Sequence, residues 1–256
     1  MNNSKLKKFF EAFYVFQNQE EYFRKISQGD KTGKLIVNQV IIICSFLFLY
    51  GIVMGAYNEL IQSIAAGLKL IFLFISTLII CFPSFFIIQL ILGSKIKLRQ
   101  VILIILSGFV LTTSILLAFI PIVVFFLLTG DNYYFLQLLH IAIFLFAGFF
   151  GIRLIIEALK YSCEKDNIYP KTGVMVFRIW IVIFAFVGIQ LAWNLRPFMG
   201  DKDQPFELFR HYEGNFYTAV IYSFDQLLGK NDINEKPKRL PFKNENDTNK
   251  FFHYDR

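Results

Sequence analysis

Five long stretches of the chain contain no Asp, Glu, Lys or Arg, and they limit the possible fold more than any other feature. A helix that crosses about 30 Å of hydrocarbon needs roughly 20 mostly apolar residues. Four stretches reach that length, and Val174–Phe177 extend the shorter fifth one. The uncharged stretches are residues 35–58, 70–94, 100–130, 132–152 and 179–195. The sequence therefore predicts an all-α, polytopic membrane protein.

The composition agrees with this class of protein. The mean hydropathy is +0.51, and charged residues make up 18% of the chain, against roughly 25% in soluble domains. Such a chain is too apolar to be disordered. The net charge is +7, and the cations flank the apolar stretches. We therefore expect the bilayer as the partner, with anionic lipid at the cytoplasmic face, and no nucleic acid.

The uncharged stretches and their flanks predict five transmembrane helices. The third stretch is longer than one straight crossing, but two crossings would need about 40 residues. We expect one long helix, tilted or bent at Pro121, with a re-entrant segment as the alternative. Residues 59–69 are expected as a short linker before the second span, and its apolar residues would line one face of a helix lying on the outer surface. The predicted spans are Leu35–Tyr57, Leu70–Leu92, Val101–Leu128, Phe135–Ala158 and Val174–Leu195.

The distribution of Lys and Arg predicts the orientation. Seven precede the first span, and the following loops contain one, three, none and three. Because Lys and Arg favour the cytoplasmic side, this alternation places the N-terminus in the cytoplasm and the C-terminus in the periplasm or outside the cell. The abundance of Phe, Ile, Asn and Lys is typical of an AT-rich bacterial genome, so we expect the bacterial inner membrane.

Outside the five-span bundle of residues 35–195, we expect three further segments. Residues 1–34 form a basic and aromatic interfacial helix, 196–229 an outer amphipathic segment, and 230–256 a disordered tail. Within 196–229, apolar residues recur at helical spacing after Asn215. Gly229 is suited to the position just after the last residue of this helix. The apolar face of this helix would lie on the outer leaflet, on its own bundle or on a partner protein. Interfacial amphipathic helices are thus expected at both ends.

A few polar residues lie within the predicted spans, where isolated charges are costly. Arg153 and Glu157 are four residues apart, so they share a helix face and form a candidate intramembrane ion pair. The remaining polar residues are candidates for hydrogen bonds between helices of the bundle. They are Asn38, Gln39, Gln89, His140, Gln190 and Asn194.

Catalytic signatures are absent from the sequence. There is no H-E-x-x-H zinc motif, no G-x-S-x-G elbow and no Walker loop. Cys44, Cys81 and Cys163 form no C-x-x-C pair. We therefore expect no catalytic residue, cofactor or metal site.

The end of the fifth span carries a recognisable motif. The run Gln190–Gly200, with Leu-Arg-Pro-Phe at its centre, is followed by Pro205–Arg210 (Pro-Phe-Glu-Leu-Phe-Arg) and Gly214–Tyr217 (Gly-Asn-Phe-Tyr). This arrangement resembles a group of uncharacterised bacterial multi-pass inner-membrane proteins. The order of five spans also resembles the Yip-type membrane proteins, which act in membrane trafficking without known catalysis. Neither resemblance implies functional residues.

The motif has a physical interpretation as an anchor for the outer segment. Trp193 suits the outer interface of the membrane, and Arg196 is expected to pair with Glu207 and fold the segment back over the bundle. Arg210 is the fourth candidate residue of this anchor. Alternatively, the motif only ends the fifth span at Pro197.

These features predict a non-enzymatic membrane subunit or scaffold of a bacterial envelope complex for secretion, motility or defence, with other membrane or envelope proteins or a second copy as partners. The alternative is a channel or transporter subunit in which Arg153, Glu157, His140 and Gln89 line a wet path. A membrane enzyme with unrecognised chemistry is the third hypothesis. Polar residues converging on a wet cavity would favour transport, whereas mutually paired polar residues in a dry bundle would favour the subunit.

Overall fold

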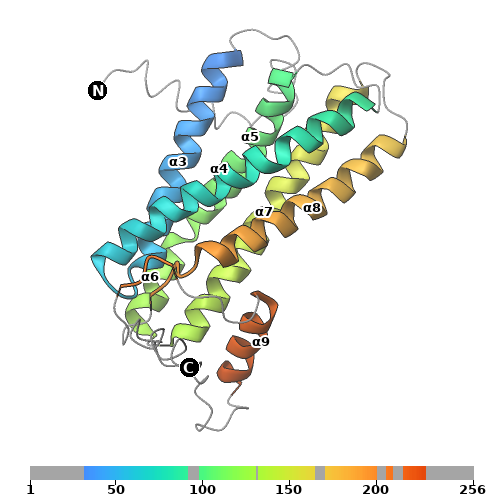
Figure 1. Ribbon diagram of the computed structural model, residues 1–256. Helices are drawn as coiled ribbons and strands as arrows, with labels where there is room; N and C mark the ends of the chain where they lie inside the picture. The colour runs from blue at the N-terminus through green and yellow to red at the C-terminus, as the bar shows by residue number, and fades with distance from the viewer. Residues whose placement is uncertain are drawn as a thin grey trace, which may run out of the picture.

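The computed structural model describes residues 32–91, 98–130, 132–164, 171–200, 206–209 and 216–228. Helices and short connections make up this part of the chain, and no strand occurs in it (Figure 1). The helices are α3 (Thr32–Gly55), α4 (Leu60–Ile91), α5 (Leu98–Ala118), α6 (Ile120–Thr129), α7 (Tyr133–Glu164), α8 (Lys171–Leu195) and α9 (Phe216–Leu227). The all-α prediction is confirmed for these residues. The predicted N-terminal interfacial helix and C-terminal tail lie outside them, apart from residues 32–34.

Among the described residues, four segments are long and apolar enough to cross a membrane. Their bounds are Gly33–Gly55, Leu60–Ile87, Leu98–Thr129 and Tyr133–Lys160. Trp180–Leu195 within α8 is a shorter apolar helix. The chain is therefore a polytopic membrane protein with at least four candidate crossings.

The helices pack side by side in one bundle (Figure 1). Helix α3 lies between α4 and α5, α5 packs on α7, and α8 packs along α4. The short α9 lies against α7 and α8 at one end of the bundle. This end, which also contains the α3–α4 and α6–α7 turns, is called the α9 end below.

Helix α8 runs antiparallel to α4 along most of its described length. The Trp180 ring lies 4.6 Å from the Phe85 ring near one end of the contact. Gly188 faces Thr77 further along, and the carbonyl of Pro197, just beyond α8, reaches Lys69. Residue numbers along α8 thus increase where those along α4 decrease. Helix α8 therefore runs beside a candidate crossing of the bundle.

Glycines allow α3 and α4 to approach at backbone distance. A Cβ atom added to Gly51 would lie 2.5 Å from the Cα of Gly67, and one added to Gly55 would lie 2.6 Å from the Cα of Ser63. Gly51 and Gly55 form a G-x-x-x-G pair on α3, which is a common spacing at membrane helix interfaces. Small residues therefore set the distance between these two helices.

A second seam of small residues joins α5 and α7. A Cβ atom added to Gly108 on α5 would lie 2.8 Å from the carbonyl oxygen of Gly151 on α7. Thr112 faces the same glycine one turn further along α5. Backbone contact at both seams explains why the bundle is tightly packed despite its many large side chains.

The third predicted span is one candidate crossing, and its helix is interrupted close to Pro121. Helix α5 ends at Ala118, α6 begins at Ile120, and Phe119 lies between them in a turn. Pro121 occupies the first turn of α6, where its missing N–H removes no helical hydrogen bond. The two helices together form the single candidate crossing Leu98–Thr129.

The predicted start of the second span was wrong. Helix α4 begins at Leu60 rather than Leu70. The helical spacing expected within 59–69 is confirmed, but residues 60–69 form the first part of α4 rather than a separate surface helix or linker. Lys69 suggested a loop because a charge normally ends a span. The structure instead buries Lys69 within α4, where backbone carbonyls accept its hydrogen bonds.

Replacing Gly51 with alanine should destabilise the bundle. The added methyl group would meet the backbone of Gly67, and overpacking of this kind typically costs about 1–3 kcal/mol. Gly148→Ala is the matched control because a Cβ atom there meets nothing within 4 Å. Thermal unfolding in detergent, followed by circular dichroism, should show loss of stability only for Gly51→Ala. Equal stability of the two variants would contradict the close α3–α4 contact.

Candidate functional site

The irregular segment after α8 is held by two polar side chains of α4. Gln62 donates from Nε2 to the carbonyl oxygens of Pro197 and Phe198, at 3.0 and 3.1 Å. Lys69 donates from Nζ to the Pro197 oxygen at 2.8 Å and also to the Leu208 oxygen. We call this arrangement, Gln62 and Lys69 with the three carbonyls, the carbonyl clamp.

The positions of Gln62 and Lys69 follow from the helix. They are seven residues apart, which places them on one face of α4 two turns apart. Both are buried, with 1% and 6% of their surface exposed. A buried ammonium is costly unless it is hydrogen-bonded, and a buried non-helical carbonyl needs a donor. The nitrogen donors of Gln62 and Lys69 and the three carbonyls therefore satisfy one another, whereas the buried Oε1 of Gln62 has no hydrogen-bond partner among the described residues.

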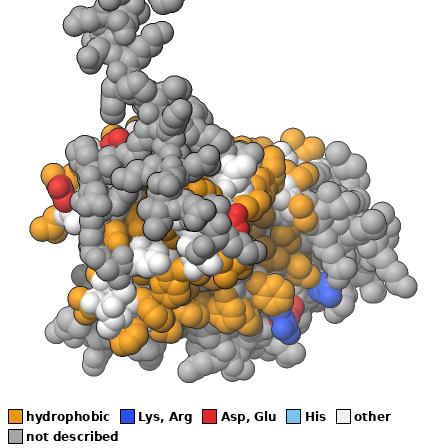
Figure 2. Space-filling view, turned by 90° about the horizontal axis from the view of Figure 1, so that it is seen from below, with side chains coloured by type: hydrophobic (Ala, Val, Ile, Leu, Met, Phe, Trp, Pro, Cys, Tyr) orange, Lys and Arg blue, Asp and Glu red, His pale blue; other side chains and the backbone are white. Residues whose placement is uncertain are grey.

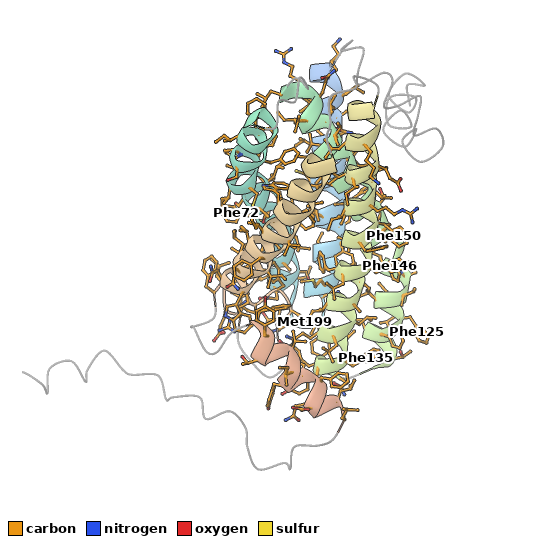
Figure 3. All side chains as sticks on the ribbon, turned by 90° about the vertical axis from the view of Figure 1, so that its right-hand side faces the viewer. Phe72, Phe125, Phe135, Phe146, Phe150 and Met199 are labelled. Atoms are coloured by element: carbon orange, nitrogen blue, oxygen red, sulfur yellow. The ribbon has the colours of Figure 1, made fainter. Side chains whose placement is uncertain are left out.

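The segment also packs into the α9 end of the bundle. Met199 is buried in a small apolar cluster with Tyr57 and Leu136. Figure 3 shows Met199 among the helices, whereas Phe125 and Phe146 lie toward the outside. Buried Gly200 lies against the side chain of Asn58 in the α3–α4 turn. Non-helical backbone thus lies between helices rather than beyond them.

Two of the four predicted anchor residues contact each other. The guanidinium carbon of Arg196 lies 3.5 Å from the centre of the Trp193 ring, which is a cation–π contact. Glu207 is partly buried, and its pairing with Arg196 stays a prediction. Arg210 lies outside the described residues.

Lys69 ties the outer segment to the bundle. It reaches the Leu208 carbonyl, and its ammonium lies 5.4 Å from the centre of the Phe209 ring. Sequence reasoning assigned this residue to a loop and therefore missed it. The available signal was a single Lys in an otherwise apolar run after Leu60.

Polar side chains in the middle of the bundle pair with one another. The Tyr50 hydroxyl on α3 lies 2.9 Å from His140 Nδ1 on α7 and forms a hydrogen bond with it. Gln39 on α3 donates from Nε2 to Ser107 Oγ on α5 at 2.9 Å. All four residues are buried. Sequence reasoning selected His140 but missed its partner, since Tyr50 lies ninety positions earlier in the chain.

The remaining candidate residues differ in their exposure where the structure describes them. Gln190 is partly buried and Asn194 is exposed on α8, and the side chain of Gln89 lies outside the described part. Arg153 Nε donates to Glu157 Oε1 at 2.8 Å on α7, and these side chains are 65% and 41% exposed. The ion pair therefore lies on the outer surface of the bundle, away from the buried Tyr50–His140 pair.

Comparisons with known proteins gave no match: no family model, no curated protein and no solved structure resembles the chain significantly. Within the part of the chain that the structure describes, no group of three or more His, Cys, Asp or Glu side chains could hold a metal ion. The carbonyl clamp is therefore characterised by its geometry alone.

Lys69→Met should release the segment around Leu208. The substitution removes the ammonium, so the Leu208 carbonyl oxygen loses its hydrogen bond from Lys69, while the Pro197 oxygen keeps the one from Gln62 Nε2. A hydrogen bond to a charged group typically contributes about 1.5–3 kcal/mol. Hydrogen–deuterium exchange of peptides covering 196–209 should become roughly tenfold faster, which corresponds to about 1.4 kcal/mol. Lys160→Met is the control because Lys160 is exposed on α7. Unchanged exchange in Lys69→Met would show that the carbonyl clamp does not hold the segment.

Proposed function

We propose that the chain is a non-enzymatic integral membrane subunit or scaffold of a complex in the bacterial inner membrane, for secretion, motility or defence. The observation that supports this role most directly is the pairing of Tyr50 with His140 and of Gln39 with Ser107 inside the bundle. A transport path needs polar groups that face water or a substrate. Here the two pairs join α3 to α7 and to α5, so these polar groups face each other rather than a path.

The positions of the charged residues also favour a subunit over a channel. Arg153 and Glu157 lie on the outer surface of α7, where they cannot share a path with buried His140. Lys69 is engaged by backbone carbonyls, so it too has a structural role. A non-enzymatic protein is the simplest proposal, because these polar groups maintain the fold.

We further propose five crossings, with the N-terminus in the cytoplasm. Helix α8 has 25 residues, or about 37 Å at 1.5 Å per residue, and it follows α4 antiparallel from Phe85 toward Lys69. A helix of this length beside a crossing helix is itself suited to cross. The positive-inside distribution of Lys and Arg supports the orientation.

The motif after α8 acquires a structural role under this proposal. Its Pro197 and Phe198 carbonyls accept hydrogen bonds from Gln62, and its Met199 fills the α9 end of the bundle. Such residues would be retained in relatives that close their bundle in the same way.

Reporter fusions test the five crossings. A reporter at residue 256 should be active on the periplasmic side, and one at the N-terminus should be active in the cytoplasm. Fusions after Gly130 and after Glu164, at opposite ends of α7, calibrate the two sides because α7 is a candidate crossing in its own right. Finding both chain ends on the same side would overturn the five-span topology.

Purification in mild detergent tests the subunit role. The tagged chain should elute with at least one other membrane or envelope protein, or with a second copy, at a fixed stoichiometry measured by native mass spectrometry. An unrelated polytopic protein with the same tag is the control for non-specific capture. Recovery of the chain as a monomer without partners would contradict the proposed role.

A further inference from the structure

Helix α9 presents two opposite faces, and its own bundle covers only one of them. On the covered face, Ser223 Oγ donates to Gln137 Oε1 of α7 at 3.3 Å. The Tyr222 ring contacts the Tyr134 ring at 5.8 Å between centres. This face therefore fixes α9 against the first turns of α7.

The opposite face is an exposed apolar stripe. Its side chains are separated by four, three and four residues, which places them on one side of the helix. Between 50% and 62% of each residue's surface is exposed. The stripe consists of Tyr217, Ile221, Phe224 and Leu228; we call it the α9 stripe.

We propose that the α9 stripe contacts the boundary between headgroups and acyl chains of the bilayer leaflet at the α9 end. The first argument is the level at which α9 lies. It packs on the first turns of α7 and near the last turn of α8, where Phe216 contacts Trp193 at 6.5 Å between ring centres. Trp and Tyr gather at the membrane–water interface, and Trp193, Tyr133 and Tyr134 mark that level here.

The second argument is continuity with other exposed apolar surface at the same end. Figure 2 looks onto the α9 end and shows mostly hydrophobic side chains, with few charged ones, in the described part. The first turns of α4, the end of α6 and the segment 206–209 contribute exposed apolar residues. They are Leu60, Ile61, Ile64, Leu68, Phe125, Leu128, Phe206, Leu208 and Phe209. The α9 stripe extends a surface that a bilayer would cover.

The third argument is the chemistry and size of the stripe. Asp225 is the one charged residue in α9, so the contact depends on apolar burial rather than on attraction to charged lipid. Three side chains on a 12-residue helix, with Leu228 just after it, are far from the roughly 800 Å² per partner of a stable protein interface. An interfacial helix needs only to bury its apolar face about 5–10 Å into the leaflet. Lipid is therefore the occupant that the stripe fits.

Depth-dependent quenching in the full-length protein tests this contact. An environment-sensitive fluorescent amino acid replaces Phe224 in the stripe or, as the matched control, Thr218, which is exposed on the polar flank of the same helix. Stop-codon suppression leaves the native cysteines in place. The purified protein is reconstituted into phosphatidylcholine vesicles with or without lipid that carries a spin label near the headgroup.

The spin-labelled lipid should quench the probe at position 224 at least threefold more strongly than the probe at 218, and aqueous iodide should show the reverse order. Strong iodide quenching at 224 would place the stripe in water and overturn the proposal. Both agents could instead quench the probe at 224 only weakly, while a photoreactive residue at 224 crosslinks two copies of the chain. That result would assign the stripe to a contact with a second copy and would also overturn the proposal. The vesicles contain no partner protein, so this result is independent of the subunit role.

Discussion

The hydrogen-bonding requirement of the backbone in a water-free environment governs this structure. Hydrocarbon offers no donors or acceptors, so a crossing segment satisfies its own backbone by forming a helix, and non-helical backbone needs partners from the protein. The segment after α8 is non-helical and packs against the bundle, so its buried carbonyls also need donors from the protein. Gln62 and Lys69 meet this need by donating to three carbonyls, and a charged side chain is thereby retained inside an apolar helix.

The same environment explains how the helices associate. Lipid chains are as apolar as the side chains, so the hydrophobic effect does not hold crossing helices together, and close packing and hydrogen bonds do so instead. Gly51 and Gly67 bring α3 and α4 into backbone contact. The Tyr50–His140 hydrogen bond connects α3 with α7, although these helices are not neighbours in sequence. Packing and polar contacts thus determine which helices are adjacent.

These interactions relate the fold to the proposed role. Polar groups that pair inside the bundle favour a rigid framework over a path for solutes, and the carbonyl clamp holds the segment that leads toward α9. A framework of this kind is suited to present fixed surfaces to lipid and to other membrane proteins. The exposed ion pair Arg153–Glu157 belongs to such a surface, since both side chains lie outside the packed core.

The amino-acid sequence alone determined the membrane class, the break before Pro121 and the helix near residues 216–227, because each depends on local composition or spacing. It did not reveal that α4 starts at Leu60, that Lys69 is buried, or that Tyr50 is the partner of His140. Those facts depend on which groups from distant segments lie near enough to donate or accept. Only the tertiary structure decides this, because a charge is tolerated in an apolar helix when its neighbours in space, rather than in sequence, satisfy it.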